Sequence, residues 1–231
     1  MSELDKYKQK RRIGRTPEPK AEKRRSDSGR VFVVQKHRAS HLHYDFRLED
    51  RGVLKSWAIP KGPSLDPAVK RLAMAVEDHP LDYAQFEGVI PEGEYGGGTV
   101  MIWDRGDYRP EGTDDVEAAL RKGELKFVLN GSKLKGSWVL IRTRNTQWLL
   151  IKHRDSYASP DDVAVSQPTS VVTRRTLAEI AAHEGGDVDK AATGDPQGSQ
   201  RTGTKDVGHG NVGQAARRPS KKTLRERRNL R

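Results

Sequence analysis

The run of residues 41–48, in which apolar and polar residues alternate without a break, most constrains the fold of this chain. Because the side chains of a β-strand point alternately to its two faces, this run predicts a strand with one apolar wall and one polar face. The wall is Leu42, Tyr44, Phe46 and Leu48, and the polar face is His41, His43, Asp45 and Arg47. Two imidazoles, a carboxylate and a guanidinium in one row are costly to hold together, and a metal ion plus an anion would stabilise them.

Three of the nearby side chains are suited to one metal ion. His43 and Asp45 lie about 7 Å apart at their Cα atoms in a strand with a rise of ~3.3 Å per residue. His37 precedes the run, and a turn at residues 38–40 would fold it back to complete a triad. The chain has no cysteine, which excludes thiolate ligands and leaves imidazole and carboxylate groups, as used by Mn²⁺, Fe²⁺ and Zn²⁺. His41 is expected outside the ligand set. A hydrated amphipathic strand is the alternative, but the density of His, Asp and Arg here favours a metal site.

The open side of such a site needs a substrate, and Arg47 shares the face of the expected ligands. Its planar guanidinium suits two oxygens of a phosphate, and Lys61 and Arg71 could add positive charge. Other chemistries have weaker signals. The glycine run at residues 96–98 lacks the spacing and the Lys-Ser/Thr of a nucleotide loop, so it predicts a tight turn. Two loop acids, Glu92 and Glu94, are weak evidence for glycoside chemistry, and no Gly-x-Ser-x-Gly nucleophile motif is present.

Short apolar runs separated by turn residues predict a mainly β fold, an antiparallel barrel or a sandwich with one or two short flanking helices. The expected strands are residues 31–36, 41–48, 53–59, 71–77, 99–103, 125–129, 136–142 and 147–152. Asp-Arg-Gly at residues 50–52 predicts a hairpin turn. Acidic residues at its start and Gly123 after its end predict one helix over residues 114–122. Residues 81–86 are expected to form a short helix or turn, and residues 176–182 one or two helical turns.

The net charge of +11 lies in the flanks of the chain. Residues 1–30 hold 11 Lys and Arg against 5 Asp and Glu, and residues 171–231 hold 13 against 7, whereas the middle is nearly neutral. Basic flanks favour salt-dependent binding to nucleic-acid phosphates, with solubility as the simpler explanation. We expect residues 1–30 to be a basic arm partly ordered on the core, 31–157 a barrel domain, and 158–231 a flexible, largely disordered tail. No apolar leader or membrane-length run is present, so a cytoplasmic, nucleoid-associated monomer is expected.

Several longer strings of this sequence resemble the 3′-phosphoesterase module of bacterial ATP-dependent DNA ligase D, over about residues 10–155. The strings are Phe-Val-Val-Gln-Lys-His at 32–37, Leu-His-Tyr-Asp-Phe-Arg-Leu-Glu at 42–49, Ser-Trp-Ala-Ile-Pro-Lys-Gly-Pro at 56–63, Val-Glu-Asp-His-Pro-Leu at 76–81 and Phe-Glu-Gly-Val-Ile-Pro at 86–91. The ligase and polymerase modules of the multidomain proteins are not expected here, which suggests a stand-alone form.

The resemblance implies a compact β-barrel with Mn²⁺-dependent end-healing activity, or the same activity with another divalent transition metal. The implied reactions remove a 3′-terminal ribonucleoside and then a 3′-phosphate, which leaves a 3′-OH on DNA or on an RNA–DNA primer-template. The implied partners are separate ligase, polymerase and Ku-type end-binding proteins. The implied metal ligands are His37, His43 and Asp45, the set that strand parity selects independently. The implied phosphate contacts are Gln35, Arg47, Lys61 and Arg71, with Arg11 and Glu18 from the arm, and further essential groups are His79 and Tyr83. Arg12 stands where the family has Asp.

As a mechanistic hypothesis, Arg47, Lys61 and Arg71 stabilise the charge that develops on the phosphorane. His79 is the candidate general acid or orienting group, because Pro80 favours an extended His79 at the end of a strand, and Tyr83 is its hydrogen-bond partner. Two other classes stay open. Two histidines and a carboxylate on a β-barrel also describe non-haem Fe(II) oxygenases. The basic flanks would also fit a non-catalytic adaptor that binds DNA ends.

Overall fold

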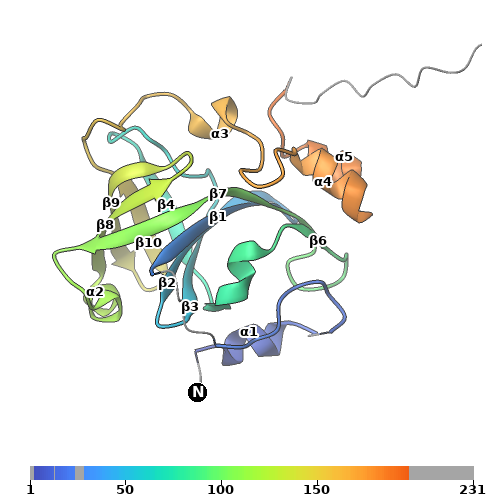
Figure 1. The fold of residues 1–231 in the computed structure, drawn as a ribbon, viewed down its shortest axis with the longest axis horizontal. Coiled ribbons are helices and arrows are strands. Elements are labelled where there is room, and N and C mark those ends of the chain that lie inside the picture. The colour runs from blue at the N-terminus through green and yellow to red at the C-terminus, as the bar shows by residue number, and fades with distance from the viewer. Residues whose placement is uncertain (1–2, 13, 24–28, 198–231) are drawn as a thin grey trace, which may run out of the picture. The chain divides into compact units, whose positions relative to one another are not determined.

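Within residues 3–12, 14–23 and 29–197, which the computed structural model describes, eight antiparallel strands close into a barrel. Their order around the barrel is β1-β2-β3-β4-β10-β9-β8-β7, and β7 pairs with β1 to complete the circle (Figure 1). The strands are β1 Val31–Arg38, β2 Leu42–Asp50, β3 Val53–Ile59, β4 Lys70–Ala75, β7 Gly98–Glu111, β8 Glu124–Gly131, β9 Lys135–Arg144 and β10 Gln147–Lys152. The expectation of a mainly β, antiparallel barrel is confirmed.

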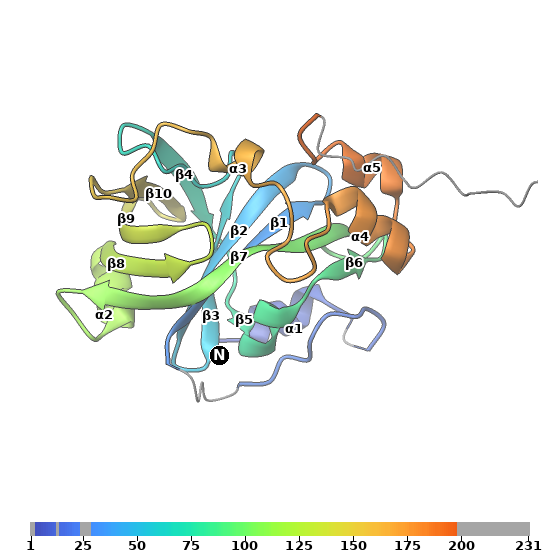
Figure 2. The same cartoon turned by 45° about the horizontal axis from the view of Figure 1, so that its top comes forward.

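Two very short strands and several short helices surround the barrel (Figure 2). β5 pairs with β3, and β6 pairs with the first residues of β7. These strands are β5 His79–Pro80 and β6 Gly88–Ile90, and the helices are α1 Asp5–Lys10, the 3-10 helix η1 Leu81–Gln85, α2 Val116–Lys122, α3 Val163–Ser166, α4 Leu177–Glu184 and α5 Val188–Ala192. None of these described helices has the length and apolar composition needed to cross a membrane.

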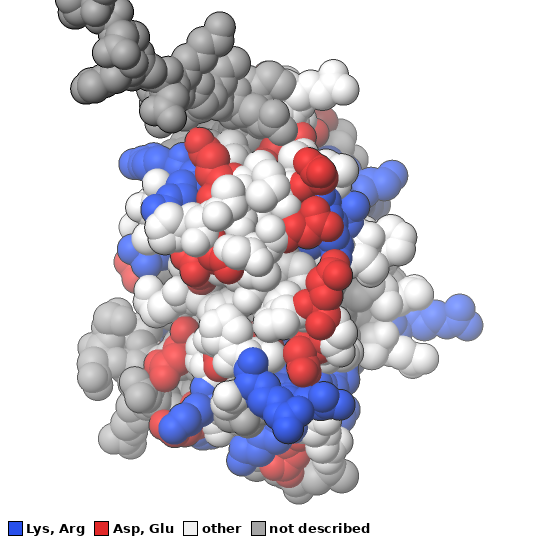
Figure 3. Space-filling view, turned by 90° about the vertical axis from the view of Figure 1, so that its right-hand side faces the viewer, with Lys and Arg blue, Asp and Glu red and all other residues white. Residues whose placement is uncertain are grey.

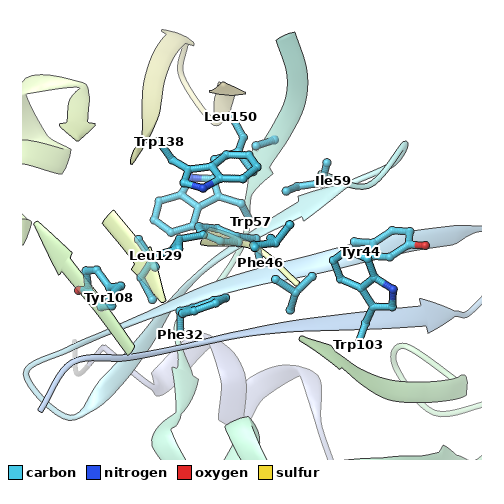
Figure 4. Close-up of a cluster of buried hydrophobic side chains, with 14 of the residues drawn as sticks. Phe32, Tyr44, Phe46, Trp57, Ile59, Trp103, Tyr108, Leu129, Trp138 and Leu150 are labelled. Carbon is cyan, nitrogen blue, oxygen red and sulfur yellow. The ribbon is translucent and has the colours of Figure 1, made fainter. Parts of the chain in front are cut away.

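The barrel interior is filled by the apolar wall that the alternation predicts. Tyr44, Phe46 and Leu48 of β2 are buried there, as expected from their shared parity. Phe46 stacks on Phe127 with ring centres 5.8 Å apart, and Tyr44 meets Trp103 edge to face at 5.3 Å. Figure 4 shows how side chains from several strands converge on this cluster. A filled interior leaves no room for a substrate, so a site carried by β2 must lie on the outer face of the sheet.

A second apolar cluster covers the outer face of β1, β3 and β7. Along the barrel strands, the residues of this cluster alternate with residues whose side chains point into the barrel interior. The helices α1 and η1 and the strand β6 supply the side chains that cover it. The buried members are Tyr7, Val33, Leu54, Tyr83, Ala84, Phe86, Ile90, Val100 and Ile102. The polar face of β2 therefore lies between the barrel wall and this covering layer.

Two local predictions are confirmed by the backbone. The hairpin after β2 has a two-residue loop, Arg51 and Gly52, both with positive φ (51° and 84°), and the amide of Gly52 donates to a Glu49 carboxylate oxygen at 2.9 Å. Positive φ at both loop positions matches the right-handed twist of the flanking strands. The helix expected at residues 114–122 is α2, whose N-cap Asp115 accepts from the amide of Ala118. Gly123 ends it in the left-handed conformation.

Residues 158–197 differ from the expectation of a flexible tail. They form α3, α4 and α5, and Leu177, Ile180 and Ala181 of α4 pack on the interior cluster. The spacing of these three residues places them on one helical face, and α4 confirms the one or two helical turns expected at residues 176–182, whereas its packing on the barrel was not expected. Tertiary packing stabilises α4, together with a capping box between Thr176 and Glu179. The rest of the expected tail, residues 198–231, lies outside the described residues.

A buried ion pair joins this C-terminal segment to the barrel. The Nζ of Lys36, on β1, lies 3.7 Å from a carboxylate oxygen of Asp195, and both side chains are 1% exposed. The same carboxylate accepts hydrogen bonds from the amides of Leu177 and Ala178 at 3.0 Å each. Asp195 therefore accepts from two amides at the start of α4 and also supplies the counter-charge of a buried ammonium.

The basic arm also contains structure that its sequence does not reveal. Residues 5–10 form α1, and Tyr7 of this helix is fully buried. The Tyr7 hydroxyl donates to the carbonyl of Pro19 at 2.8 Å, so the arm folds back on itself over the outer cluster. The part of the arm that the structure describes is thus ordered against the barrel, as expected where it meets the core.

Candidate metal centre and phosphate pocket

The three expected metal ligands meet on the outer face of β1 and β2. His37 pairs directly with His43 in the antiparallel register, and Asp45 follows on the same face of β2. One donor atom from each lies within 4.8 Å of the others, which is close enough to bind a single ion. His37 belongs to β1 itself, and the turn after Arg38 brings the two strands together, as the sequence predicts.

Backbone carbonyls orient both imidazoles. The Nε2 of His37 donates to the carbonyl of Gly96 at 2.8 Å, and the Nδ1 of His43 donates to the carbonyl of His41 at 3.0 Å. The remaining ring nitrogens, Nδ1 of His37 and Nε2 of His43, each lie 3.6 Å from the same Asp45 oxygen. A metal-binding imidazole normally donates its other N–H to a carbonyl or carboxylate, which fixes the tautomer that leaves the second nitrogen free. The side chains therefore fit a divalent metal.

The charge of Asp45 is stabilised before any ligand binds. Burial would raise the pKa of this carboxyl, but Arg47 and the imidazoles of His37 and His43 outweigh burial and hold it well below its usual value. The Nη2 of Arg47 is 3.2 Å from Asp45. For His43 the same pairing acts in reverse: burial lowers the pKa, yet the Asp45 carboxylate raises it overall. The carboxylate is thus ionised at neutral pH, as a metal ligand must be.

The glycine run forms a tight turn, as expected, and it also supports His37. Gly96 has φ 79°, and its carbonyl is the acceptor for the His37 ring. A Cβ on Gly98 would lie 2.2 Å from the carbonyl oxygen of Arg38, so the turn packs directly against the end of β1. Glycine is needed where backbones approach this closely.

Arg47 lies beside the metal ligands with its guanidinium fixed in place. It is 2% exposed, and its Nε donates to the Oε1 of Gln35 at 2.8 Å. The amide nitrogen of Gln35 in turn donates to the carbonyls of Tyr83 and Phe86 at 3.0 and 2.8 Å. Gln35 therefore holds Arg47 in place, and its expected direct contact to phosphate stays a prediction.

His79 lies between two guanidinium groups. Arg47 Nη1 is 3.0 Å from its Nδ1, and Arg11 Nη2 is 3.0 Å from its Nε2. Its Nδ1 also lies 2.9 Å from the carbonyl of Glu77, which accepts the ring proton and leaves Nε2 to accept from Arg11. Burial, followed by the positive charges of Arg47 and Arg11, lowers the pKa of His79 well below its usual value. The imidazole is therefore neutral at neutral pH.

The arm supplies Arg11 and the residues that hold it. Its guanidinium pairs with Glu18 at 2.8 Å and with Glu77 at 3.0 Å, and it lies 4.0 Å from the centre of the Tyr7 ring. Glu18 also accepts from the Tyr83 hydroxyl at 3.0 Å. Burial, then the nearby Glu18 carboxylate, raises the pKa of Tyr83 well above its usual value, so this hydroxyl keeps its proton.

These side chains surround one cavity of about 220 Å³, large enough for a phosphate group and its attached sugar. The metal ligands and Arg11, Arg47, His79 and Tyr83 all line it. One cavity thus offers a candidate metal site and, beside it, two guanidiniums and a neutral imidazole. This pairing of a cation site with anion-binding groups is what phosphate-ester chemistry requires.

Comparison with known families agrees with this chemistry. Residues 35–142 match the family described as the DNA Ligase D 3′-phosphoesterase domain. The barrel domain belongs to this family. The match includes the three candidate metal ligands, Arg47, His79 and Tyr83, and it ends within β9.

Three curated relatives share the phosphoesterase domain with this chain. The multifunctional non-homologous end joining protein LigD of Pseudomonas aeruginosa is 56% identical over 183 residues, which is 75% of this chain and 22% of the relative. The LigD of Mycobacterium tuberculosis is 46% identical over 147 residues, 63% of this chain and 19% of the relative. The LigD of Mycolicibacterium smegmatis is 39% identical over 190 residues, 79% of this chain and 25% of the relative. The chain thus spans about a fifth to a quarter of these proteins.

Two expected phosphate contacts, Lys61 and Arg71, do not line the cavity of the phosphoesterase domain. Lys61 is exposed just beyond the end of β3. Arg71 of β4 is paired with Leu150 of β10. Its side chain extends from the same face of β4 as that of Ala73, which belongs to the interior cluster. Sheet alternation therefore directs Arg71 away from the face that carries the metal ligands. Contacts from these two residues to phosphate stay predictions.

Other residues at the site were not found from the sequence. Tyr7 packs its ring against His79 with centres 5.2 Å apart, and Glu77 pairs with both Lys10 and Arg11. Nothing in the local pattern distinguishes these residues, because their role arises from the docking of the arm. His41 is exposed and offers only its carbonyl, as expected for a residue outside the ligand set. Arg12 is 68% exposed and 3.8 Å from Glu94, and it does not line the cavity.

Proposed function

We propose that this chain is a metal-dependent hydrolase that repairs blocked DNA 3′ ends. It removes a 3′-terminal ribonucleoside as a phosphodiesterase and a 3′-phosphate as a phosphomonoesterase, and it leaves a 3′-OH. The observation that carries this proposal is that the His37, His43 and Asp45 triad lines the same cavity as Arg47, Arg11 and His79. The family match supports the same substrate chemistry, and the relatives are named as non-homologous end joining proteins, which supports a role in that repair.

The metal would be held by Nδ1 of His37, Nε2 of His43 and the Asp45 carboxylate. We propose Mn²⁺, because this mixed imidazole and carboxylate set suits manganese as well as other divalent transition metals. When bound, such an ion supplies Lewis-acid polarisation of a phosphate oxygen and activation of water.

The guanidinium groups beside this triad stabilise negative charge. Arg47 is already aimed by Gln35, so it binds phosphate oxygens without a cost in reorganisation at the moment of reaction. Arg11 reaches the same cavity from the arm and is held by Glu18 and Glu77. A dianionic phosphate placed between the two guanidiniums would offset the like charges that surround His79.

His79 has two candidate roles, general acid or orienting group. Its low pKa in the free site favours the orienting role, because an imidazole that is neutral at working pH holds only one proton and donates it to the carbonyl of Glu77. To act as a general acid, it would have to gain a second proton after phosphate binds. A pH–rate profile of His79→Gln against the unsubstituted chain distinguishes the two roles.

The charge on the surface indicates how a DNA end approaches. Figure 3 shows the side that carries β6, α4 and α5, where acidic side chains spread over the middle and top. Basic side chains gather at the lower end, the level at which α1 lies in Figure 1. We propose that the duplex phosphates bind on the side of the arm, whose described part holds the exposed Lys8 and Arg15. We also propose that other end-joining proteins act on the same DNA ends in the cytoplasm.

One experiment tests the proposal directly. The chain is incubated with Mn²⁺ and a 5′-labelled primer-template that ends in one ribonucleotide, and a matched substrate carries a 3′-phosphate. We expect a primer shortened by one nucleoside and then dephosphorylated, with both reactions abolished by His43→Ala and retained by His41→Ala. Intact substrates in every lane, with a folded protein, would contradict the proposal.

A further inference from the structure

Tyr95 is an exposed aromatic residue at the mouth of the phosphate cavity, and the proposed chemistry gives it no role. It lies on the turn between β6 and β7, lines the cavity of the metal ligands, and is 49% exposed. Burying an aromatic ring is favourable, so a ring of this size left in solvent beside a reactive site is available to a ligand.

The position of the Tyr95 ring is fixed relative to the metal centre. Its hydroxyl accepts a hydrogen bond from Lys10 at 3.1 Å, and the Arg11 guanidinium lies 5.4 Å from the ring centre. The next residue, Gly96, binds His37 through its carbonyl. The ring is therefore held both by the arm and by the loop that supports a metal ligand.

The charges around Tyr95 determine which part of a DNA end it suits. Two acidic residues, Glu92 and Glu94, share its loop, and each is paired with a cation, Glu92 with Lys190 at 3.2 Å and Glu94 with Arg12 at 3.8 Å. The cations nearest the ring are also paired, since Lys10 and Arg11 both bind Glu77. Because these cations already have carboxylate partners, the loop is poorly suited to the phosphates of the strand upstream of the scissile bond, and the exposed ring is what it offers to a ligand. A terminal nucleoside, which carries no further phosphate, needs no such cation.

We propose that Tyr95 stacks on the base of the 3′-terminal nucleoside that leaves in the phosphodiesterase reaction. Aromatic side chains bind nucleobases by stacking because every base offers a π face, with little preference for sequence. Tyr95 is then a specificity-determining residue for the leaving nucleoside, and the 3′-phosphate substrate, which has no nucleoside beyond its phosphate, makes no use of it. This inference rests on the proposed function.

The test compares three primer-templates that end in a ribonucleotide, in an abasic ribose, or in a 3′-phosphate. For Tyr95→Ala we expect kcat/KM to fall about tenfold on the ribonucleotide and to stay within twofold on the other two substrates. Tyr95→Phe keeps the ring and loses only the hydroxyl, so it should retain most of the activity. Tyr157→Ala is the matched control, since Tyr157 is 51% exposed and does not line the cavity.

A second readout does not depend on catalysis. With 2-aminopurine as the 3′-terminal base and no added metal, binding of the unsubstituted chain should change its fluorescence, and Tyr95→Ala should abolish most of that change. An equal loss of kcat/KM on all three substrates, or an unaltered fluorescence signal in Tyr95→Ala, would overturn the inference. If the unsubstituted chain cleaves nothing, the proposed function fails, and the fluorescence result still decides whether Tyr95 stacks on the terminal base.

Discussion

Gln35 and Arg47 lie on neighbouring strands, and the Oε1 of Gln35 accepts a 2.8 Å hydrogen bond from the Nε of Arg47. Because Gln35 is itself bound to two carbonyls in the covering layer, it transmits the position of that layer to the guanidinium. Arg47 is thus aimed by a neutral amide, and its charge remains available to Asp45 and to substrate.

Gln35→Leu should lower kcat about 10- to 100-fold, because a misplaced guanidinium stabilises the transition state less well. The Kd for Mn²⁺ should change less than threefold, since Gln35 does not belong to the ligand set. Steady-state kinetics and calorimetric titration with Mn²⁺ measure the two quantities. A parallel loss of metal affinity would show that Gln35 instead supports the sheet around His37 and Asp45.

Removal of one metal ligand should abolish the stabilisation that metal binding gives. For a ligand that binds only the folded state at 100 times its Kd, this stabilisation is about 2.7 kcal/mol. His43→Ala should show no rise in Tm on addition of Mn²⁺, whereas His41→Ala should behave as the unsubstituted chain. The metal chelator EDTA should reverse the rise. A rise that persists in His43→Ala would place the metal elsewhere.

The buried neutral His79 should make the metal-free protein less stable as the pH falls. Its folded pKa is well below 6.5, so between these two values the unfolded chain binds a proton that the folded chain does not. The free energy of unfolding should fall by up to about 1.4 kcal/mol per pH unit below pH 6.5 from this residue. Urea denaturation at pH 7.5 and pH 5.5 measures this change, and the free energy of unfolding should decrease less between the two pH values in His79→Gln than in the unsubstituted chain. Equal decreases in the two proteins would mean that His79 is protonated in the folded state.

Removing one partner of the buried ion pair between Lys36 and Asp195 should destabilise the protein more than removing both. Asp195→Asn leaves the Lys36 ammonium buried without a counter-charge and should cost about 3–5 kcal/mol of stability. The double substitution of Lys36→Met with Asp195→Asn should recover much of this loss. Denaturant titration of the two single variants and the double variant measures the coupling, and additive effects would contradict a direct pairing.

The sequence predicts the barrel and the metal ligands for the same reason. Period-two alternation is a local property, and in β2 it defines both the interior wall and the face that holds His43 and Asp45. The turn after β1 then places His37 opposite His43. Predicting these features requires only local sequence and the rules of antiparallel strand pairing.

The parts that sequence reasoning missed depend on contacts between distant segments. Tyr7 is buried because α1 docks on the outer cluster, and Leu177 is buried because α4 packs on the interior one. Both helices are shorter than nine residues, and helices this short have little stability alone. Arg71 was assigned from closeness in sequence, whereas sheet parity places it on the other face of β4, so its contact with phosphate stays a prediction.

The two-sided character of β2 also bears on errors in folding. The candidate metal ligands of β2 alternate with core rings, so a shift of one residue in its pairing with β1 would bring Tyr44 and Phe46 to the outer face and turn His43, Asp45 and Arg47 into the barrel interior. A misregistered chain would therefore lose metal binding and stability in the same step. Metal binding can then serve as an assay of correct strand register, sensitive to slipped species whose overall β content would look normal.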